Sequence, residues 1–110
     1  MITKIYESPE GKKPYLEWFK SIKDKTIRGL ITAKVFELRA GNFNRCKSLG
    51  GGLYELKLFF GAGYRVYFAR VGDQILLLLG GGTKNTKGEQ QRDILKAKRH
   101  YMRFKKTLCQ

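Results

Sequence analysis

The feature that most constrains this chain is the segment Leu53–Phe68, in which apolar and polar side chains alternate on both sides of a glycine-containing turn. A period of two is typical of half-buried β-strands, and Gly61-Ala62-Gly63 supplies the permissive backbone of a turn. The segment is therefore predicted to form a β-hairpin from strands 53–60 and 64–68. One face is apolar, and the other carries Glu55, Lys57, Arg65 and Tyr67.

The expected register follows from a three-residue turn. It places Phe59 opposite Arg65 and Lys57 opposite Tyr67, with Glu55 on the same face. Two cations, a carboxylate and a phenol would then share an open sheet surface that could hold a phosphodiester. Antiparallel sheets more commonly expose an idle, solvated face with a cross-strand ion pair, so the pattern alone leaves both interpretations open.

Turn and helix signals predict the remaining elements. In chain order these are a strand over Ile2–Glu7, a helix from Pro14, a helix capped by Asp24 and ended by Gly41, a loop over Asn42–Gly52, a strand over Gln74–Leu79 ended by three glycines, and a last helix after the capping box Thr86–Glu89. The all-apolar run before the glycines is typical of a central strand covered on both sides.

We therefore predict a single α+β domain over residues 1–110, in the order strand, helix, helix, three antiparallel strands, helix. The last three strands form a meander because consecutive strands usually pair. The helices are expected to pack on one face of the sheet and to leave the hairpin's polar face open.

The charge of the chain narrows its partners. Among 110 residues, 23 are Lys or Arg and nine are Asp or Glu, which gives a net charge of +14. This balance favours a polyanion or an acidic protein as partner. No apolar run is long enough to span a bilayer, and Met1–Pro9 lacks the apolar core of a signal peptide. Cys46 and Cys109 form no metal or redox spacing, so we expect a cytoplasmic protein without metal or cofactor and without a membrane partner.

The polar face of the hairpin is the first candidate for chemistry. Attack of an RNA 2′-hydroxyl on phosphorus needs a proton acceptor, charge stabilisation and a proton donor. Arg65 can clamp two phosphate oxygens with its planar fork, and Lys57 can stabilise charge or accept a proton. Glu55 can serve as a base or position Lys57. Tyr67 can stack on a base or donate a hydrogen bond.

Two further regions are candidates for binding an anion. Residues Gly80–Lys87 place glycines, Lys84 and Lys87 before a helix, where backbone N–H groups can cradle a phosphate. The basic last helix, with Lys98 and Arg99, can track a phosphate backbone. A plain turn and an ordinary amphipathic helix explain the same residues, so these alternatives also stay open.

Three sequence blocks closely resemble the RelE/ParE superfamily of toxins, in its HigB-like branch of phage-related addiction module killer proteins. The blocks are LYELKL at Leu53–Leu58, GYRVYF at Gly63–Phe68 and LLLGGGTK at Leu77–Lys84, and the resemblance covers nearly the whole chain in the same order. It implies a RelE-like fold and a toxin that a neighbouring antitoxin neutralises. Many members are metal-independent, ribosome-dependent mRNA endonucleases, whereas some ParE members inhibit DNA gyrase.

The resemblance also implies roles for individual residues. Arg65 matches the arginine at the scissile phosphate, Lys57 a basic residue on the preceding strand, and Lys84 the basic residue after the last strand. The HigB-like branch typically has a glutamate at Glu55. Two departures leave proton transfer unassigned: the tyrosine of RelE near the start of the last helix has no counterpart, and Lys87 stands where the branch usually has glutamine. The remaining donor and acceptor candidates are Glu55, Tyr67, Lys87 and His100.

We accordingly predict the toxin of a type II toxin–antitoxin system that cleaves mRNA on the ribosome. The alternatives are a non-enzymatic ParE-like gyrase inhibitor and a basic RNA-binding protein without catalysis. The expected partners are mRNA, the ribosome and a cognate antitoxin with an acidic segment and, by family analogy, a helix-turn-helix domain. The expected RNA contacts are Tyr67, Arg45, Lys47, Lys87, Lys98 and Arg99.

Overall fold

The computed structural model describes residues 1–61, 63–83 and 86–108. The elements of this part of the chain are β1 (Ile2–Ile5), α1 (Pro14–Ser21), α2 (Lys25–Arg39), β2 (Cys46–Gly50), β3 (Leu53–Leu58), β4 (Tyr64–Val71), β5 (Ile75–Thr83) and α3 (Lys87–Leu108). The strands form one five-stranded sheet in the order β1-β5-β4-β3-β2. β1 runs parallel to β5, and the other pairs are antiparallel. The α+β class is therefore confirmed.

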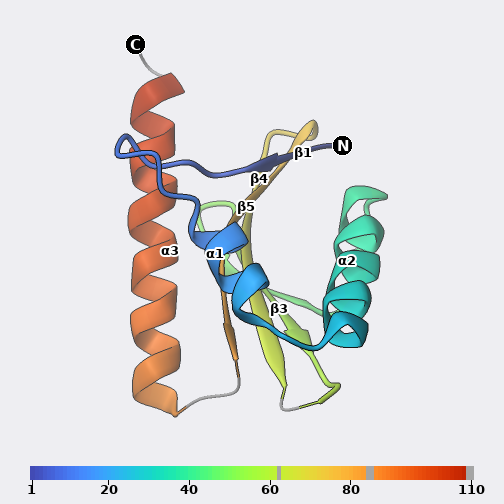
Figure 1. Ribbon diagram of the computed structural model, residues 1–110. Helices are drawn as coiled ribbons and strands as arrows, with labels where there is room; N and C mark the ends of the chain where they lie inside the picture. The colour runs from blue at the N-terminus through green and yellow to red at the C-terminus, as the bar shows by residue number, and fades with distance from the viewer. Residues whose placement is uncertain (62, 84–85, 109–110) are drawn as a thin grey trace.

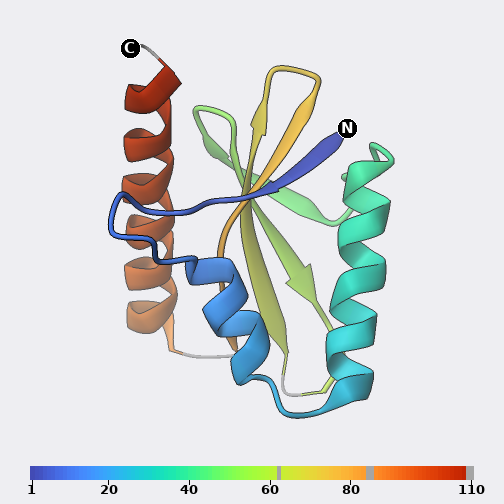
Figure 2. The same ribbon diagram turned by 45° about the horizontal axis from the view of Figure 1, so that its top comes forward.

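The helices cover both faces of the sheet (Figures 1 and 2). Side chains of α1 and α2, among them Tyr15 and Ile31, pack with Val66 and Phe68. On the opposite face, Tyr101 and other residues of α3 pack with Tyr67, Ala69, Leu77 and Leu79. The prediction that all helices pack on one face is therefore wrong. β4 and β5 carry apolar side chains on both of their faces, and each set requires its own cover.

The local signals for helix ends are confirmed. Pro14 is the first residue of α1. The Asp24 carboxylate accepts hydrogen bonds from the backbone N–H groups of Thr26 and Ile27, which caps α2. Thr86 Oγ1 accepts a 3.2 Å hydrogen bond from the Glu89 N–H before α3. The side chains of these capping residues accept hydrogen bonds from N–H groups that have no partner inside the helix. Residues of this kind are therefore favoured at helix starts, which makes the starts predictable from the sequence.

The segment predicted as a loop over Asn42–Gly52 contains the strand β2, so this prediction is wrong. β2 pairs with the outer edge of β3, and Lys47 lies opposite Glu55. Gly50, Gly51 and Gly52 have φ values of +93°, +63° and +89°, so they form the tight connection between the two strands. The sequence of β2 lacks a regular alternation, and its strand conformation depends on the unpaired edge that β3 offers.

β5 does not end at Leu79 as predicted but continues through the glycines to Thr83. Gly80, Gly81 and Gly82 pair with residues of β4, so they are not the predicted loop around an anion. A side chain at Gly81 would overlap the six-membered ring of the Trp18 indole. Gly81 is therefore required by the close packing of α1 against β5.

Replacing Gly81 with alanine tests this packing. We expect Gly81→Ala to lower the free energy of unfolding by about 1–3 kcal/mol, because the added methyl displaces Trp18. Gly80→Ala is the matched control, since no described atom lies within 4 Å of a Cβ there, and it should change stability by less than about 0.5 kcal/mol. Urea unfolding of both variants measures the difference, and equal losses would contradict the assigned contact.

Candidate functional site

The polar residues of the hairpin pair in a register two residues away from the predicted one. Lys57 lies opposite Arg65, and Glu55 lies opposite Tyr67. β3 ends at Leu58, and the connection to β4 includes a 3.0 Å hydrogen bond from the Gly63 N–H to the Phe60 carbonyl. Because side chains alternate with a period of two, a shift by two residues changes the partners but keeps every side chain on its predicted face.

The pairing arranges these side chains in two rows across the sheet, on the face that α3 covers. The inner row consists of Lys47, Glu55, Tyr67 and Gly80. The outer row consists of Lys57, Arg65 and Gly82. The glycines contributed by β5 place no side chain beside Tyr67 or Arg65, which leaves room for both of these long side chains.

Glu55 lies at the centre of the site and is buried, with 1% of its surface exposed. Gln90 in the first turn of α3 donates a 3.0 Å hydrogen bond from Nε2 to Glu55 Oε2. The other carboxylate oxygen, Oε1, lies 4.0 Å from Arg65 Nε, at the outer limit of an ion pair. The expected open face is therefore wrong for Glu55 and for Tyr67, which is also buried, whereas Lys47 at the end of the inner row is exposed. Glu55 is placed to orient Arg65 and to hold the start of α3.

Tyr67 is buried beside Glu55, with 1% of its surface exposed. Burial raises the pKa of its phenol, and the charges of Glu55 and Asp93 raise it further, whereas Arg65 acts in the opposite direction. The phenol is therefore neutral at physiological pH. Its ring lies inside the protein rather than on a surface where a base could stack.

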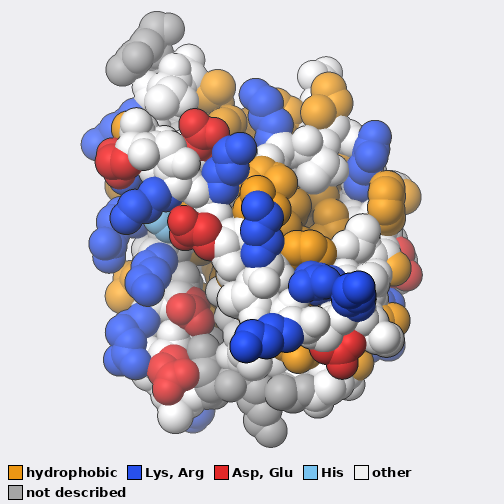
Figure 3. Space-filling model, viewed as in Figure 1, with side chains coloured by type: hydrophobic (Ala, Val, Ile, Leu, Met, Phe, Trp, Pro, Cys, Tyr) orange, Lys and Arg blue, Asp and Glu red, His pale blue; other side chains and the backbone are white. Residues whose placement is uncertain are grey.

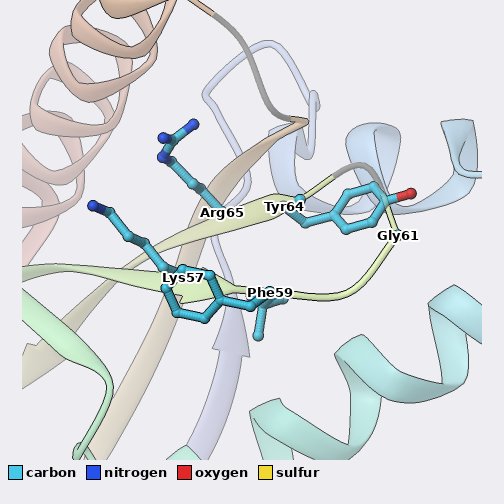
Figure 4. A pocket seen from close by; sticks show the side chains of 7 residues that line it. Lys57, Phe59, Gly61, Tyr64 and Arg65 are labelled. Atoms are coloured by element: carbon cyan, nitrogen blue, oxygen red, sulfur yellow. The ribbon is translucent and has the colours of Figure 1, made fainter.

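The outer row remains accessible at the hairpin end. Lys57 and Arg65 extend to the same side of the hairpin (Figure 4) and line a pocket of about 340 Å³. Phe59 and Tyr64 also line this hairpin-end pocket. The Arg65 side chain is 18% exposed. Most of it is therefore buried, with Nε beside Glu55, while a part of it stays accessible to solvent. Two adjacent cations, one of them a planar fork, suit an anion with several oxygens.

A second pocket of about 230 Å³ lies at the free edge of β3 and is lined by Lys34, Arg45, Lys57, Phe59 and Phe60, together with Leu58. Arg45 precedes Cys46, whose partner is Leu56, and this places Arg45 next to Lys57 along the sheet edge. Lys34 comes from α2 and forms a 3.3 Å ion pair with Glu37. This edge pocket joins one predicted RNA contact, Arg45, to the hairpin.

The other predicted residues lie elsewhere. Lys87 is the first residue of α3, and Lys98 and Arg99 are exposed further along this helix. His100 lies about 15 Å along the helix axis from Gln90, with its ring 5.0 Å from that of Tyr6. Burial lowers the pKa of His100, and the charges of Arg103, Arg99 and Lys96 lower it further. Lys84 lies outside the described residues.

Sequence reasoning missed Gln90, Lys34 and Phe59 as residues of the site. The capping box correctly indicated where α3 begins. Which residue of its first turn faces Glu55 depends on how the helix docks, and no sequence pattern specifies that. The alternation places Phe59 on the same strand face as Lys57 but assigns it no role, although two adjacent phenylalanines before a glycine turn are a visible signal.

On the face shown in Figure 3, the basic side chains are spread out rather than gathered in one patch. Lys and Arg side chains cover α3 and recur across the rest of the face in Figure 3, with acidic side chains between them. Among the described residues, no group of three or more His, Cys, Asp or Glu side chains is placed to hold a metal ion. Within the same residues, no helix has the length and apolarity needed to cross a bilayer.

These features define a small basic α+β protein whose sheet presents a pair of cations in an open pocket. The family model of the phage-derived, Gp49-like proteins matches residues 17–102. An uncharacterized protein of Haemophilus influenzae is 37% identical over 81 residues, which cover 74% of this chain and 79% of that protein. The chain belongs to the Gp49-like family, a family of RelE-like addiction-module toxins.

Substitutions at Glu55 test its place in the site. We expect Glu55→Ala to lower the free energy of unfolding by about 3 kcal/mol, because Gln90 loses its acceptor and the buried part of Arg65 loses the negative charge beside it. Glu55→Gln keeps one acceptor oxygen and should cost about 1 kcal/mol. Urea unfolding near pH 7 measures both values. An unchanged free energy of unfolding for Glu55→Ala would contradict the buried contact.

The buried tyrosines predict how stability changes at alkaline pH. Burial raises the pKa of Tyr15 to about 12, and the pKa of Tyr67 is also raised. Above the ordinary tyrosine pKa of about 10, the unfolded chain loses phenol protons that the folded protein keeps. Stability is therefore present below about pH 10 and falls above it, by up to about 1.4 kcal/mol per pH unit for each tyrosine. In urea unfolding between pH 9 and 11.5, Tyr67→Phe should show a shallower decline, and an unchanged decline would contradict the burial of this phenol.

Proposed function

We propose that the protein is the toxin of a type II toxin–antitoxin system and that it is a metal-independent, ribosome-dependent mRNA endonuclease. The observation that carries the proposal is the pair of cations in the hairpin-end pocket, with Arg65 held from behind by Glu55 at 4.0 Å. A planar guanidinium held in place by a buried carboxylate is suited to a phosphate that must be bound in a fixed orientation.

In this mechanism Arg65 binds two non-bridging oxygens of the scissile phosphate, and Lys57 lies beside the charge that develops on the phosphorane. The 2′-hydroxyl oxygen of the preceding ribose attacks phosphorus and loses its proton to water. The bond from phosphorus to the 5′-oxygen breaks, and that oxygen takes a proton from water. The products are a 2′,3′-cyclic phosphate and a 5′-hydroxyl. Glu55 acts as a positioning residue, because it is buried.

The charge of the chain supports the proposed partners. A net charge of +14 favours binding to the phosphate-dense ribosome, and we propose that the exposed side chains of Lys98 and Arg99 on α3 and Lys47 on β2 contact its phosphates. The same charge favours an antitoxin with an acidic segment, which would cover the basic pockets when the toxin is silent. Lys87 is proposed to add charge at the start of α3, and Lys84, which precedes it in the sequence, is proposed to contribute a further charge to phosphate binding.

The first test replaces the two cations of the pocket. We expect Arg65→Ala to lower the rate of mRNA cleavage by at least about 100-fold, since it removes the group that orients and stabilises the phosphate. Arg65→Lys should restore part of the rate, because lysine keeps the charge but not the fork. Lys57→Ala should also lower the rate. Primer extension on a message translated by purified ribosomes measures cleavage, and induction in growing cells measures arrest.

Lys106→Ala, at the exposed end of α3, is the control that removes the same charge away from the pocket. Full cleavage by a folded Arg65→Ala protein would contradict the proposed site. DNA breaks with intact mRNA would instead support a gyrase inhibitor. RNA binding without cleavage or arrest would support a binding protein without catalysis.

A further inference from the structure

Phe59 is a large apolar side chain without a core position. It follows the last residue of β3, and 76% of its surface is exposed, the largest value among the exposed large hydrophobic side chains of the described residues. Its neighbour Phe60 behaves differently, since its ring lies 6.0 Å from that of Tyr64 and it packs against the core. Single exposed apolar residues are common, so exposure alone assigns no role to Phe59.

The surroundings of Phe59 distinguish it from an ordinary exposed residue. It lines both the hairpin-end pocket and the edge pocket, and Lys57 lines both as well. The first pocket adds Arg65, and the second adds Lys34 and Arg45. None of the described residues that line either pocket is acidic. An aromatic ring therefore lies between two separate places that attract anions.

We propose that Phe59 stacks on a base of single-stranded RNA whose flanking phosphates occupy the two pockets. This inference rests on the proposed function for the identity of the RNA and adds a subsite next to the proposed cleavage site. A nucleotide chain repeats a phosphate and a flat base, and proteins that bind single strands combine cationic grooves with exposed aromatic rings. An acidic peptide would pair with the cations but has no need of an aromatic ring between them.

The hairpin supports such a role by its geometry. Lys57 is the penultimate residue of β3 and Phe59 directly follows β3, and both side chains line the hairpin-end pocket and the edge pocket. The side chains of Lys57 and Arg65 extend to the same side of the hairpin (Figure 4). The phosphate on Lys57 and Arg65 would be the one that is cleaved, and the base on Phe59 would fix the register of the RNA in the site. Phe59 is thus a binding residue that positions the substrate.

The test measures the affinity of the full chain for a short, fluorescently labelled single-stranded RNA at low salt. The RNA carries 2′-O-methyl groups, so it cannot be cleaved by attack of a 2′-hydroxyl. We expect Phe59→Leu to weaken binding about 5- to 100-fold, which is the range for loss of one stacked base. Phe59→Trp should bind at least as tightly as the natural chain. Phe36→Leu is the matched control, since Phe36 is 58% exposed on the outer face of α2.

A second probe separates stacking from charge. Inorganic polyphosphate has phosphates but no bases, so Phe59→Leu should bind it as tightly as the natural chain does. A series of RNAs carries one abasic nucleotide at successive positions. The natural chain should bind the RNA that lacks the stacked base more weakly than the others, and Phe59→Leu should bind all of them with equal affinity. Circular dichroism and urea unfolding verify that the variants are folded.

Several outcomes would overturn the proposal. The first is that Phe59→Leu binds RNA with unchanged affinity, and the second is that its affinity falls equally for RNA and polyphosphate. The third is that the natural chain does not bind RNA. The fourth is that the natural chain sediments as a dimer and Phe59→Leu as a monomer, which would make Phe59 a contact between two copies. Cleavage on ribosomes is measured separately. If the natural chain cleaves and Phe59→Leu binds RNA normally, the subsite fails and the endonuclease stands. If Phe59 contributes to binding but no cleavage occurs, the subsite stands and the endonuclease fails.

Discussion

The arrangement of the site depends on one buried carboxylate. Glu55 is bound by Gln90 at 3.0 Å and lies 4.0 Å from Arg65, so a single side chain joins the first turn of α3 to both strands of the hairpin. A buried carboxylate is costly unless it is paired, and here both partners are fixed by secondary structure. The energy that keeps Glu55 buried therefore also fixes the orientation of Arg65. A surface arginine without this support would sample many rotamers and would lose entropy when it binds an anion.

The coverage of the sheet explains why the hairpin end is open. α3 covers the part of the sheet face that carries Glu55 and Tyr67, while α1 and α2 cover the opposite face (Figures 1 and 2). β2 pairs with β3 only as far as Leu56, so Lys57 and Phe59 follow beyond the covered edge. The same sheet thus provides a buried end, where Tyr67 lies beside Glu55, and an accessible end, where Lys57 and Arg65 line the hairpin-end pocket.

The sequence predicted the parts of this arrangement that depend on local physics. Alternation correctly assigned Glu55, Lys57, Arg65 and Tyr67 to one face. The predicted register was wrong by two residues, and a shift by an even number of residues leaves each side chain on the same face. Caps such as Asp24 are local hydrogen bonds and were also predictable. The burial of Glu55 and Tyr67 was not predictable, because it depends on which face α3 covers. Strand β2 was missed because its conformation comes from the edge of β3 rather than from its own side chains.

The clustering of cations at the hairpin end has a consequence for regulation. Lys57, Arg65, Arg45 and Lys34 line two adjoining pockets, and none of the described residues that line these pockets is acidic. Repulsion among these cations is relieved by any polyanion that binds there, so RNA and an acidic antitoxin segment would both bind favourably to the same surface. Two ligands that relieve the same repulsion at the same place exclude each other. Neutralisation of the proposed toxin then needs no change of fold, only an antitoxin whose acidic segment binds these pockets more tightly than RNA does.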